Sequence, residues 1–175
     1  MDLKQYIRNV PDFPQPGILF RDITPLLQHH AAFKAVVDRF TDEYRSAKLD
    51  AVVVIESRGF IFGAPLAYNL GIGLVPVRKP GKLPAAHLSV EYSLEYGTSQ
   101  LDIHEDALKR GDNVVIVDDL LATGGTAMAA AKLVELLGAR VHSFGFLVEL
   151  AFLKGRERLQ DYEVRSLVTY AGERV

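Results

Sequence analysis

Two adjacent carboxylates and a glycine-containing turn stand close together in the second half of the chain. Asp118 and Asp119 follow the apolar residues 114–117, and small residues fill positions 122–126. The apolar run is typical of a buried strand, and apolar residues at helical spacing over 126–138 predict a helix. A strand, a tight turn and a helix together form an anion site, because the turn N–H groups and the positive end of the helix dipole converge.

The carboxylate pair distinguishes this turn from the common nucleotide-binding loops. The chain has no Gly-x-x-x-x-Gly-Lys-[Ser/Thr] pattern, and no Gly-x-Gly-x-x-Gly follows a strand. Two carboxylates would repel a polyphosphate, whereas the hydroxyls of a sugar diol would donate hydrogen bonds to them. We therefore expect Asp118 and Asp119 to bind a ribose whose 5′-phosphate is held by Ala122, Thr123, Gly124, Gly125 and Thr126. For an isolated Asp-Asp pair, two solvated acids at a strand end would be the better interpretation.

A second strand, turn and helix precede this one. Residues 51–55 are a continuous apolar run, Glu56-Ser57-Arg58-Gly59 follows, and a helix is expected from near Phe60. A guanidinium fixed at a strand end suits a bidentate oxyanion such as pyrophosphate. A solvated surface arginine is the alternative for Arg58.

A basic loop follows the third predicted strand, residues 74–77. Its two prolines and one glycine exclude a helix, and three cations lie within five residues: Arg78, Lys79 and Lys82. The loop is expected to be mobile and to close over pyrophosphate and exclude water. His87 could assist there, and a solvated turn is the alternative.

Composition limits the classes of function. The 175 residues suit one domain, 1–175, and no apolar run approaches the roughly 20 residues of a membrane span. A net charge of −2 argues against general nucleic-acid binding. The start of the chain shows no signal-peptide pattern, and the lack of cysteine fits a cytoplasmic enzyme.

The remaining elements are predicted from periodicity and proline positions. Residues 3–10 are expected to be a short helix, and the proline-rich residues 11–25 an ordered, extended apolar segment that covers a ligand or serves as a packing arm or subunit contact. Pro65 should lie in the first turns of its helix. Other expected elements are a helix over 33–44, strands near 101–103 and over 141–150, a charged turn or helix over 154–159, and an edge strand over 162–168.

Several of these motifs together resemble one enzyme family. Residues 114–126 resemble the phosphoribosyl-pyrophosphate motif of type I phosphoribosyltransferases. Residues 13–25, Phe-Pro-x-Pro-Gly-Ile-x-Phe-Arg-Asp-Ile-Thr-Pro, resemble the N-terminal hood of the adenine phosphoribosyltransferases, and Tyr-x-Leu-Glu-Tyr-Gly at 92–97 resembles their flap. The resemblance implies an α/β fold with a mainly parallel central sheet flanked by helices, a hood over about 1–30 and a mobile flap over about 78–98. It also implies a homodimer and a cis peptide bond between Glu56 and Ser57.

The same resemblance implies a reaction and residue roles. Adenine and 5-phospho-α-D-ribose 1-diphosphate would give AMP and pyrophosphate through an oxocarbenium-like transition state. Mg²⁺ would be held mainly by the substrate, with no metal ligand assigned directly to the protein. The implied catalytic residues are Glu95, Arg58 and Tyr96. The implied adenine site comprises Phe20 stacked on the purine, Leu150 across from it, and backbone near Leu19 and Arg21.

Two rival functions are compatible with parts of this sequence. Another phosphoribosyltransferase, acting on hypoxanthine, guanine or xanthine, would share residues 114–126. A regulator that senses phosphoribosyl pyrophosphate would need a nucleic-acid-binding segment, and the residues before Pro11 leave little room for one. Arg58, Lys79 and Glu95 favour an enzyme.

Overall fold

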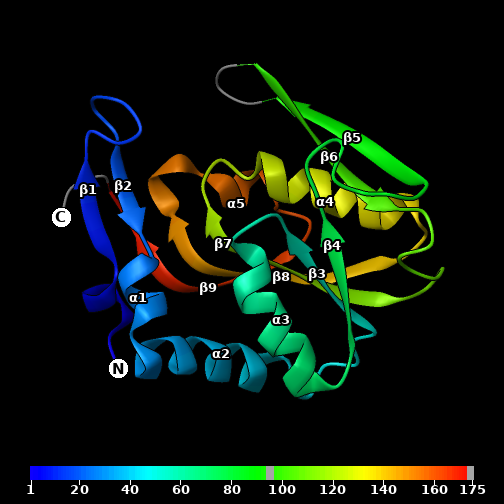
Figure 1. The fold of residues 1–175 in the computed structure, drawn as a ribbon, viewed down its shortest axis with the longest axis horizontal. Helices are drawn as coiled ribbons and strands as arrows, with labels where there is room; N and C mark the ends of the chain where they lie inside the picture. The colour runs from blue at the N-terminus through cyan, green and yellow to red at the C-terminus, as the bar shows by residue number, and fades with distance from the viewer. Residues whose placement is uncertain (94–96, 173–175) are drawn as a thin grey trace.

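The central layer is a five-stranded parallel sheet. The computed structural model describes residues 1–93 and 97–172. The sheet has the strand order β4-β3-β7-β8-β9, and every pairing within it is parallel (Figure 1). Its strands are β4 (Gly73–Val77), β3 (Ala51–Ile55), β7 (Asn113–Leu121), β8 (Arg140–Leu150) and β9 (Glu163–Tyr170). The predicted parallel sheet and its edge strand are confirmed.

Helices cover both faces of this sheet, which explains the continuous apolar runs in its strands. Helices α2 (His30–Tyr44) and α3 (Gly59–Leu70) cover one face, and α4 (Gly125–Leu136) covers the other (Figure 1). Alternate residues of each strand enter different cores: Val52 and Val54 pack with the α2–α3 side, whereas Val53 and Ile55 pack with the α4 side. Two apolar cores thus hold the strand ends in register.

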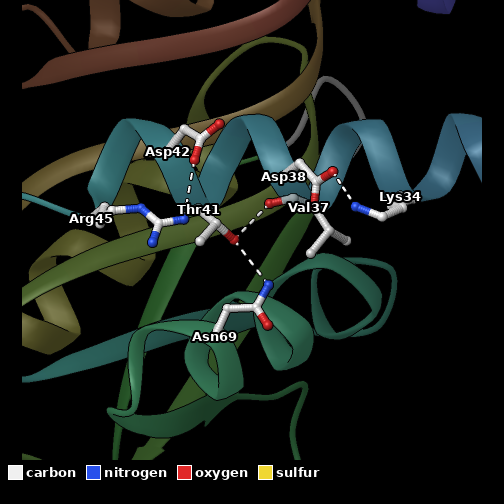
Figure 2. A network of polar contacts seen from close by, with 7 residues as sticks. All are labelled: Lys34, Val37, Asp38, Thr41, Asp42, Arg45 and Asn69. Carbon is white, nitrogen blue, oxygen red and sulfur yellow. Dashed lines mark hydrogen bonds and ion pairs between the residues drawn. The ribbon is translucent and has the colours of Figure 1, made fainter.

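A partly buried polar contact joins α2 to α3. Asn69 Nδ2 donates a hydrogen bond to Thr41 Oγ1 at 3.1 Å, and Thr41 Oγ1 donates to the Val37 carbonyl at 2.8 Å (Figure 2). This contact helps to position Arg58, because Arg58 is the N-cap of α3.

Pro65 lies inside α3, so the prediction that it falls in the first turns was wrong. The C-terminal half of α3 is held by packing, with Leu66 fully buried, so the helix continues past the missing N–H of Pro65.

The N-terminal region is a small antiparallel pair with flanking short helices. After a 3₁₀-helix, η1 (Leu3–Tyr6), the strands β1 (Arg8–Pro11) and β2 (Leu19–Asp22) pair, and α1 (Thr24–Gln28) follows. The predicted helix over 3–10 was therefore wrong for its second half. Pairing with β2 satisfies the backbone there, and the Arg8–Asp22 ion pair at 2.7 Å joins the two strands.

A second antiparallel pair stands above α4 (Figure 1). It comprises β5 (His87–Ser93) and β6 (Thr98–His104), and an isolated bridge from Arg78 to Asp102 connects it to the end of β4. Beyond β8, η2 (Ala151–Leu153) and α5 (Gly155–Arg158) lie beside the start of α4. In the described part of the chain, no helix is both long and apolar enough to cross a membrane. The hood and flap, as functional units with the boundaries given above, remain predictions.

Candidate functional site

The two predicted anion-binding turns meet because their strands are neighbours. Strands β3 and β7 are parallel partners, with Val54 opposite Val117, so their carboxyl ends lie at one edge of the sheet. A cavity of about 400 Å³ opens at that edge. The residues that line it are Glu56, Ser57, Arg58, Lys79, Tyr92, Ser99, Leu101, Asp118, Asp119, Leu120, Ala122 and Thr126. Ligands bind in this position in open α/β sheets.

An ion pair joins two residues that the sequence assigned to different parts of the substrate. Arg58 Nε lies 2.5 Å from Asp119 Oδ2, across 61 positions of sequence. Asp119 is buried, whereas the Arg58 side chain is 47% exposed. Because Asp119 engages only Nε in this bond, the terminal guanidinium nitrogens remain able to bind an anion. Asp119 thus orients Arg58, the residue predicted to bind pyrophosphate, and also lines the cavity.

Asp118 lies in an environment that disfavours its ionised form. Burial and then the neighbouring charge of Asp119 hold the pKa of Asp118 well above its usual range. The Asp119 N–H donates to Asp118 Oδ1 at 2.9 Å, and Gly59 closes the space beside it. A Cβ at Gly59 would lie 2.8 Å from the Val117 carbonyl and 3.1 Å from Asp118 Oδ1. Among the described residues, the Asp119 N–H is the one hydrogen-bond donor to the Asp118 carboxylate, and ribose hydroxyls would supply further donors to the ionised form.

The phosphate turn, which comprises residues 122–126, is formed by close backbone packing. Strand β7 continues to Leu121, past the predicted run of 114–117, and Gly124 has a φ of 82° as the N-cap of α4. The turn also contacts α5: a Cβ at Gly155 would lie 2.3 Å from the Ala122 carbonyl. Ala122 and Thr126 line the cavity, and the chain between them is Thr123, Gly124 and Gly125. Sequence reasoning missed Gly155, which lies 29 positions beyond Thr126, the last residue of the turn.

The cations of the basic loop do not all face the cavity. Glu56 accepts hydrogen bonds from Arg78 Nε at 3.2 Å and from the Lys79 N–H at 3.0 Å. Burial acts to raise the pKa of Glu56, but these hydrogen bonds and the nearby positive charges lower it below its usual range. Lys79 lines the cavity, Arg78 is bound to Glu56, and Lys82 is exposed. The role of Glu56 was not predicted, although it stands within the turn that the sequence singled out. The predicted cis peptide bond between Glu56 and Ser57 is present.

The predicted adenine residues come from two other elements. Phe20 on β2 places its ring centroid 6.0 Å from the Arg58 guanidinium carbon, which brings the N-terminal strands to the cavity. The guanidinium of Arg21 instead lies over the ring of Tyr170, 4.0 Å from its centroid, so its predicted contact to adenine would use backbone. Leu19 is half-buried, and Leu150 lies half-buried at the end of β8. The predicted catalytic residues Glu95 and Tyr96 lie outside the described residues.

The remaining cavity residues were missed by sequence reasoning for different reasons. Ser57 lies in the Glu-Ser-Arg-Gly turn at 56–59, so its place next to Arg58 in the sequence could have indicated that it lines the cavity. Tyr92 was seen only as part of the flap pattern. Ser99 and Leu101 come from β6, and nothing in the local sequence indicates that this strand reaches β3 and β7.

Comparison with known proteins assigns the chain to a family. The phosphoribosyl transferase domain family matches residues 23–170. The adenine phosphoribosyltransferase of Acaryochloris marina is 60% identical over 170 residues, covering 97% of this chain and 100% of its own. The crystal structure of the Thermoanaerobacter pseudethanolicus adenine phosphoribosyltransferase superposes with a TM-score of 0.93 at 56% identity, covering 96% of this chain and 98% of its own.

A third relative was solved with ligands. The Saccharomyces cerevisiae adenine phosphoribosyltransferase, complexed with adenine and an imino-altritol bisphosphate, has a TM-score of 0.89 at 43% identity, covering 94% of this chain and 96% of its own. Similarity of this extent, over nearly the full length of each partner, covers every element that lines the cavity. The chain therefore belongs to the phosphoribosyltransferases and, within them, to the adenine phosphoribosyltransferase family.

Proposed function

We propose that this protein transfers the 5-phosphoribosyl group of phosphoribosyl pyrophosphate to adenine, releasing AMP and pyrophosphate in purine salvage. One observation carries the proposal: a guanidinium, a carboxylate pair and the two ends of a glycine-containing turn, Ala122 and Thr126, line one cavity of about 400 Å³. These groups match the three polar parts of the substrate, namely the pyrophosphate, the ribose diol and the 5′-phosphate. The family assignment makes adenine the acceptor.

Each group has a role that follows from its charge. The turn Ala122–Thr126 holds the 5′-phosphate at the positive end of α4, and Asp118 and Asp119 accept hydrogen bonds from the ribose hydroxyls. Arg58 and Lys79, with Arg78 and Lys82 of the same loop, neutralise the departing pyrophosphate. Adenine attacks C1 of an oxocarbenium-like sugar from the face opposite pyrophosphate. Positioning and electrostatics, without a covalent intermediate, lower the barrier.

The base is placed by the segments predicted from the resemblance. Phe20 lies close enough to Arg58 for a purine stacked on its ring to reach the sugar beside the carboxylates. Leu150 bounds the other side, and the backbone of Leu19 and Arg21 reads the purine edge. The resemblance assigns two further roles, proton exchange with a ring nitrogen to Glu95 and contact with the reacting sugar to Tyr96.

Magnesium fits the chemistry of this cavity. The described residues contain no cluster of three or more His, Cys, Asp or Glu side chains able to hold a metal ion. Carboxylate oxygens of Asp118 and Asp119 line the cavity, and Mg²⁺ prefers oxygen ligands and is commonly bound through substrate phosphates. When bound, Mg²⁺ supplies positive charge to the pyrophosphate. We assign it to the substrate, without a direct protein ligand.

The proposal is tested by base-resolved turnover. AMP formation from adenine and phosphoribosyl pyrophosphate is expected with Mg²⁺, and it should stop with a chelator and return with added Mg²⁺. Hypoxanthine, guanine and xanthine, assayed in parallel, should give little product. Preferred turnover of an oxopurine would overturn the roles of Phe20 and Glu95. Binding of phosphoribosyl pyrophosphate without turnover of any base would indicate a regulator instead.

We also propose a cytoplasmic homodimer. Exposed apolar side chains gather on α3 and the edge strand β4, where Tyr68 is 87% exposed and Ile61 and Leu74 are exposed by more than a third. Burying these side chains against a second copy would remove apolar surface from water. Tyr68→Glu should therefore shift the sedimentation profile from dimer to monomer, whereas Tyr162→Phe should leave it unchanged. A wild-type monomer at micromolar concentration would contradict the dimer.

A further inference from the structure

Tyr92 joins the second antiparallel pair to the phosphate turn. Its side chain reaches from β5 to the first turn of α4, where its hydroxyl accepts a hydrogen bond from Thr126 Oγ1 at 3.3 Å. The ring is half-buried and packs against the core on the α4 side of the sheet. Tyr92 lines the cavity described above and also a second one of about 420 Å³ that contains Gly125 and Arg158. Tyr92 therefore separates the cavity at the ends of β3 and β7, here called the active-site cavity, from the second cavity.

Counting protons shows that this pair of hydroxyls retains a donor. Each hydroxyl carries one proton, and their mutual hydrogen bond uses one of the two, whichever residue donates. Neither hydroxyl donates to any other acceptor among residues 1–93 and 97–172. Both residues line the active-site cavity, so the remaining proton is placed beside the phosphate turn.

Strand β5 is also seated directly on the start of α4. The Ser93 carbonyl lies 3.5 Å from the position that a Cβ on Gly125 would occupy, and the Tyr92 ring lies at the same distance. Along the chain, Ser93 leads directly into the Leu-Glu-Tyr-Gly pattern that contains Glu95. A ligand bound by Tyr92 would therefore contact the chain only three residues before Glu95, the residue proposed to exchange a proton with the base.

We propose that Tyr92 is a further substrate-binding residue, whose hydroxyl donates a hydrogen bond to the 5′-phosphate next to Thr126. A phosphate oxygen accepts the proton that the hydroxyl pair leaves free, and charge strengthens this hydrogen bond relative to the neutral one it accompanies. The contact also holds the end of β5 against the phosphate turn when substrate is bound. The inference rests on the proposed placement of the 5′-phosphate at residues 122–126.

The test is Tyr92→Phe, which removes one hydroxyl and keeps the ring in its packing. Loss of a hydrogen bond to a charged group is expected to raise KM for phosphoribosyl pyrophosphate by about tenfold. KM for adenine should change less than about twofold. The melting temperature should change little, because the hydrogen bond from Thr126 that is also lost is long, at 3.3 Å, and lies at a cavity open to water. Tyr162→Phe is the matched control, because its hydroxyl donates to Glu135 at 2.6 Å on an exposed part of α4. It should leave both KM values unchanged.

Inhibition by the two halves of phosphoribosyl pyrophosphate, ribose 5-phosphate and pyrophosphate, separates a contact to the 5′-phosphate from a general structural effect. In Tyr92→Phe, inhibition by ribose 5-phosphate, which carries the 5′-phosphate, should weaken by about the same factor as KM rises. Inhibition by pyrophosphate should not change. Equal weakening for both inhibitors would overturn the inference, because it would indicate a distorted cavity.

Thr126→Val distinguishes failure of this inference from failure of the site assignment. If Thr126→Val raises KM for phosphoribosyl pyrophosphate and Tyr92→Phe does not, the role of Tyr92 is refuted and the phosphate turn stands. If neither variant has an effect, the placement of the 5′-phosphate is refuted as well. Support for the inference requires both effects, with a double variant whose effect is less than their product, because the two hydroxyls share one ligand.

Discussion

Asp118→Asn is expected to lower turnover by about a hundredfold while leaving the protein at least as stable at neutral pH. Asparagine preserves the shape of the side chain but removes the negative charge that binds the ribose hydroxyls and stabilises positive charge at C1. Steady-state kinetics with saturating adenine and phosphoribosyl pyrophosphate measure the effect. Asp161→Asn, at an exposed position of the same charge, is the control and should retain full turnover.

The stability half of this prediction follows from the direction of the pKa shift. Burial and the charge of Asp119 raise the pKa of Asp118 in the folded state, so folded protein binds this proton more tightly than unfolded protein. Stability from this group is therefore lost as pH rises from the unfolded value of about 4 through the raised folded pKa. The Asp118→Asn variant has no ionisable group at this position and does not lose this stability. Between acidic and neutral pH, the melting temperature of the variant should therefore fall by less than that of the wild type.

Thermal unfolding across that pH range provides the check. A variant that melts well below wild type at neutral pH would show that the ionised carboxylate stabilises the fold, contrary to its pKa direction. Full turnover in the variant would remove Asp118 from the ribose site.

Gly155→Ala is expected to disable phosphate binding from a position outside the predicted motif. The added Cβ would lie 2.3 Å from the Ala122 carbonyl and 2.8 Å from Leu121 Cδ1, so the backbone of the phosphate turn must move. Overpacking of this kind should lower the free energy of unfolding by about 1–3 kcal/mol. KM for phosphoribosyl pyrophosphate should rise by at least about tenfold, because a shift of the turn misaligns its N–H groups.

Gly73→Ala is the matched control for this variant. A Cβ there meets nothing within 4 Å, and neither glycine has a positive φ, so neither change strains the backbone through φ and the space available is the main difference. Chemical denaturation and initial-rate kinetics on both variants measure the two effects. Wild-type kinetics in Gly155→Ala would show that α5 moves instead of the phosphate turn.

The local elements of this protein are largely determined by its sequence. The apolar runs over 51–55 and 114–117 predicted buried strands. The structure explains the pattern, because helices cover both faces of the sheet and polar alternation is absent. The turn at 122–126 was recognisable because strand, carboxylates, glycines and helix are contiguous. Motif resemblance extended the prediction to the N-terminal segment 13–25, because its proline and aromatic pattern is also contiguous.

Errors arose where distant packing overrode local preference. Residues 8–11 form a strand because β2 supplies hydrogen-bond partners, a fact absent from residues 3–10 themselves. Pro65 is tolerated inside α3 because the buried side of that helix, with Phe62 and Leu66, is held by the sheet and α2. In both cases, tertiary contacts outweighed a weak local propensity.

The relations among site residues were decided only by the tertiary structure. The sequence alone predicted Arg58, Asp118 and Asp119 as separate ligands, but not that Asp119 would orient Arg58 across 61 positions. Nor did it indicate that Gly155 packs against the phosphate turn or that Tyr92 contacts Thr126. Residue types and spacing determine which chemistry is available, because they are local. Which groups share a cavity depends on strand order and on the packing of hairpins and helices around it, and those are properties of the whole chain.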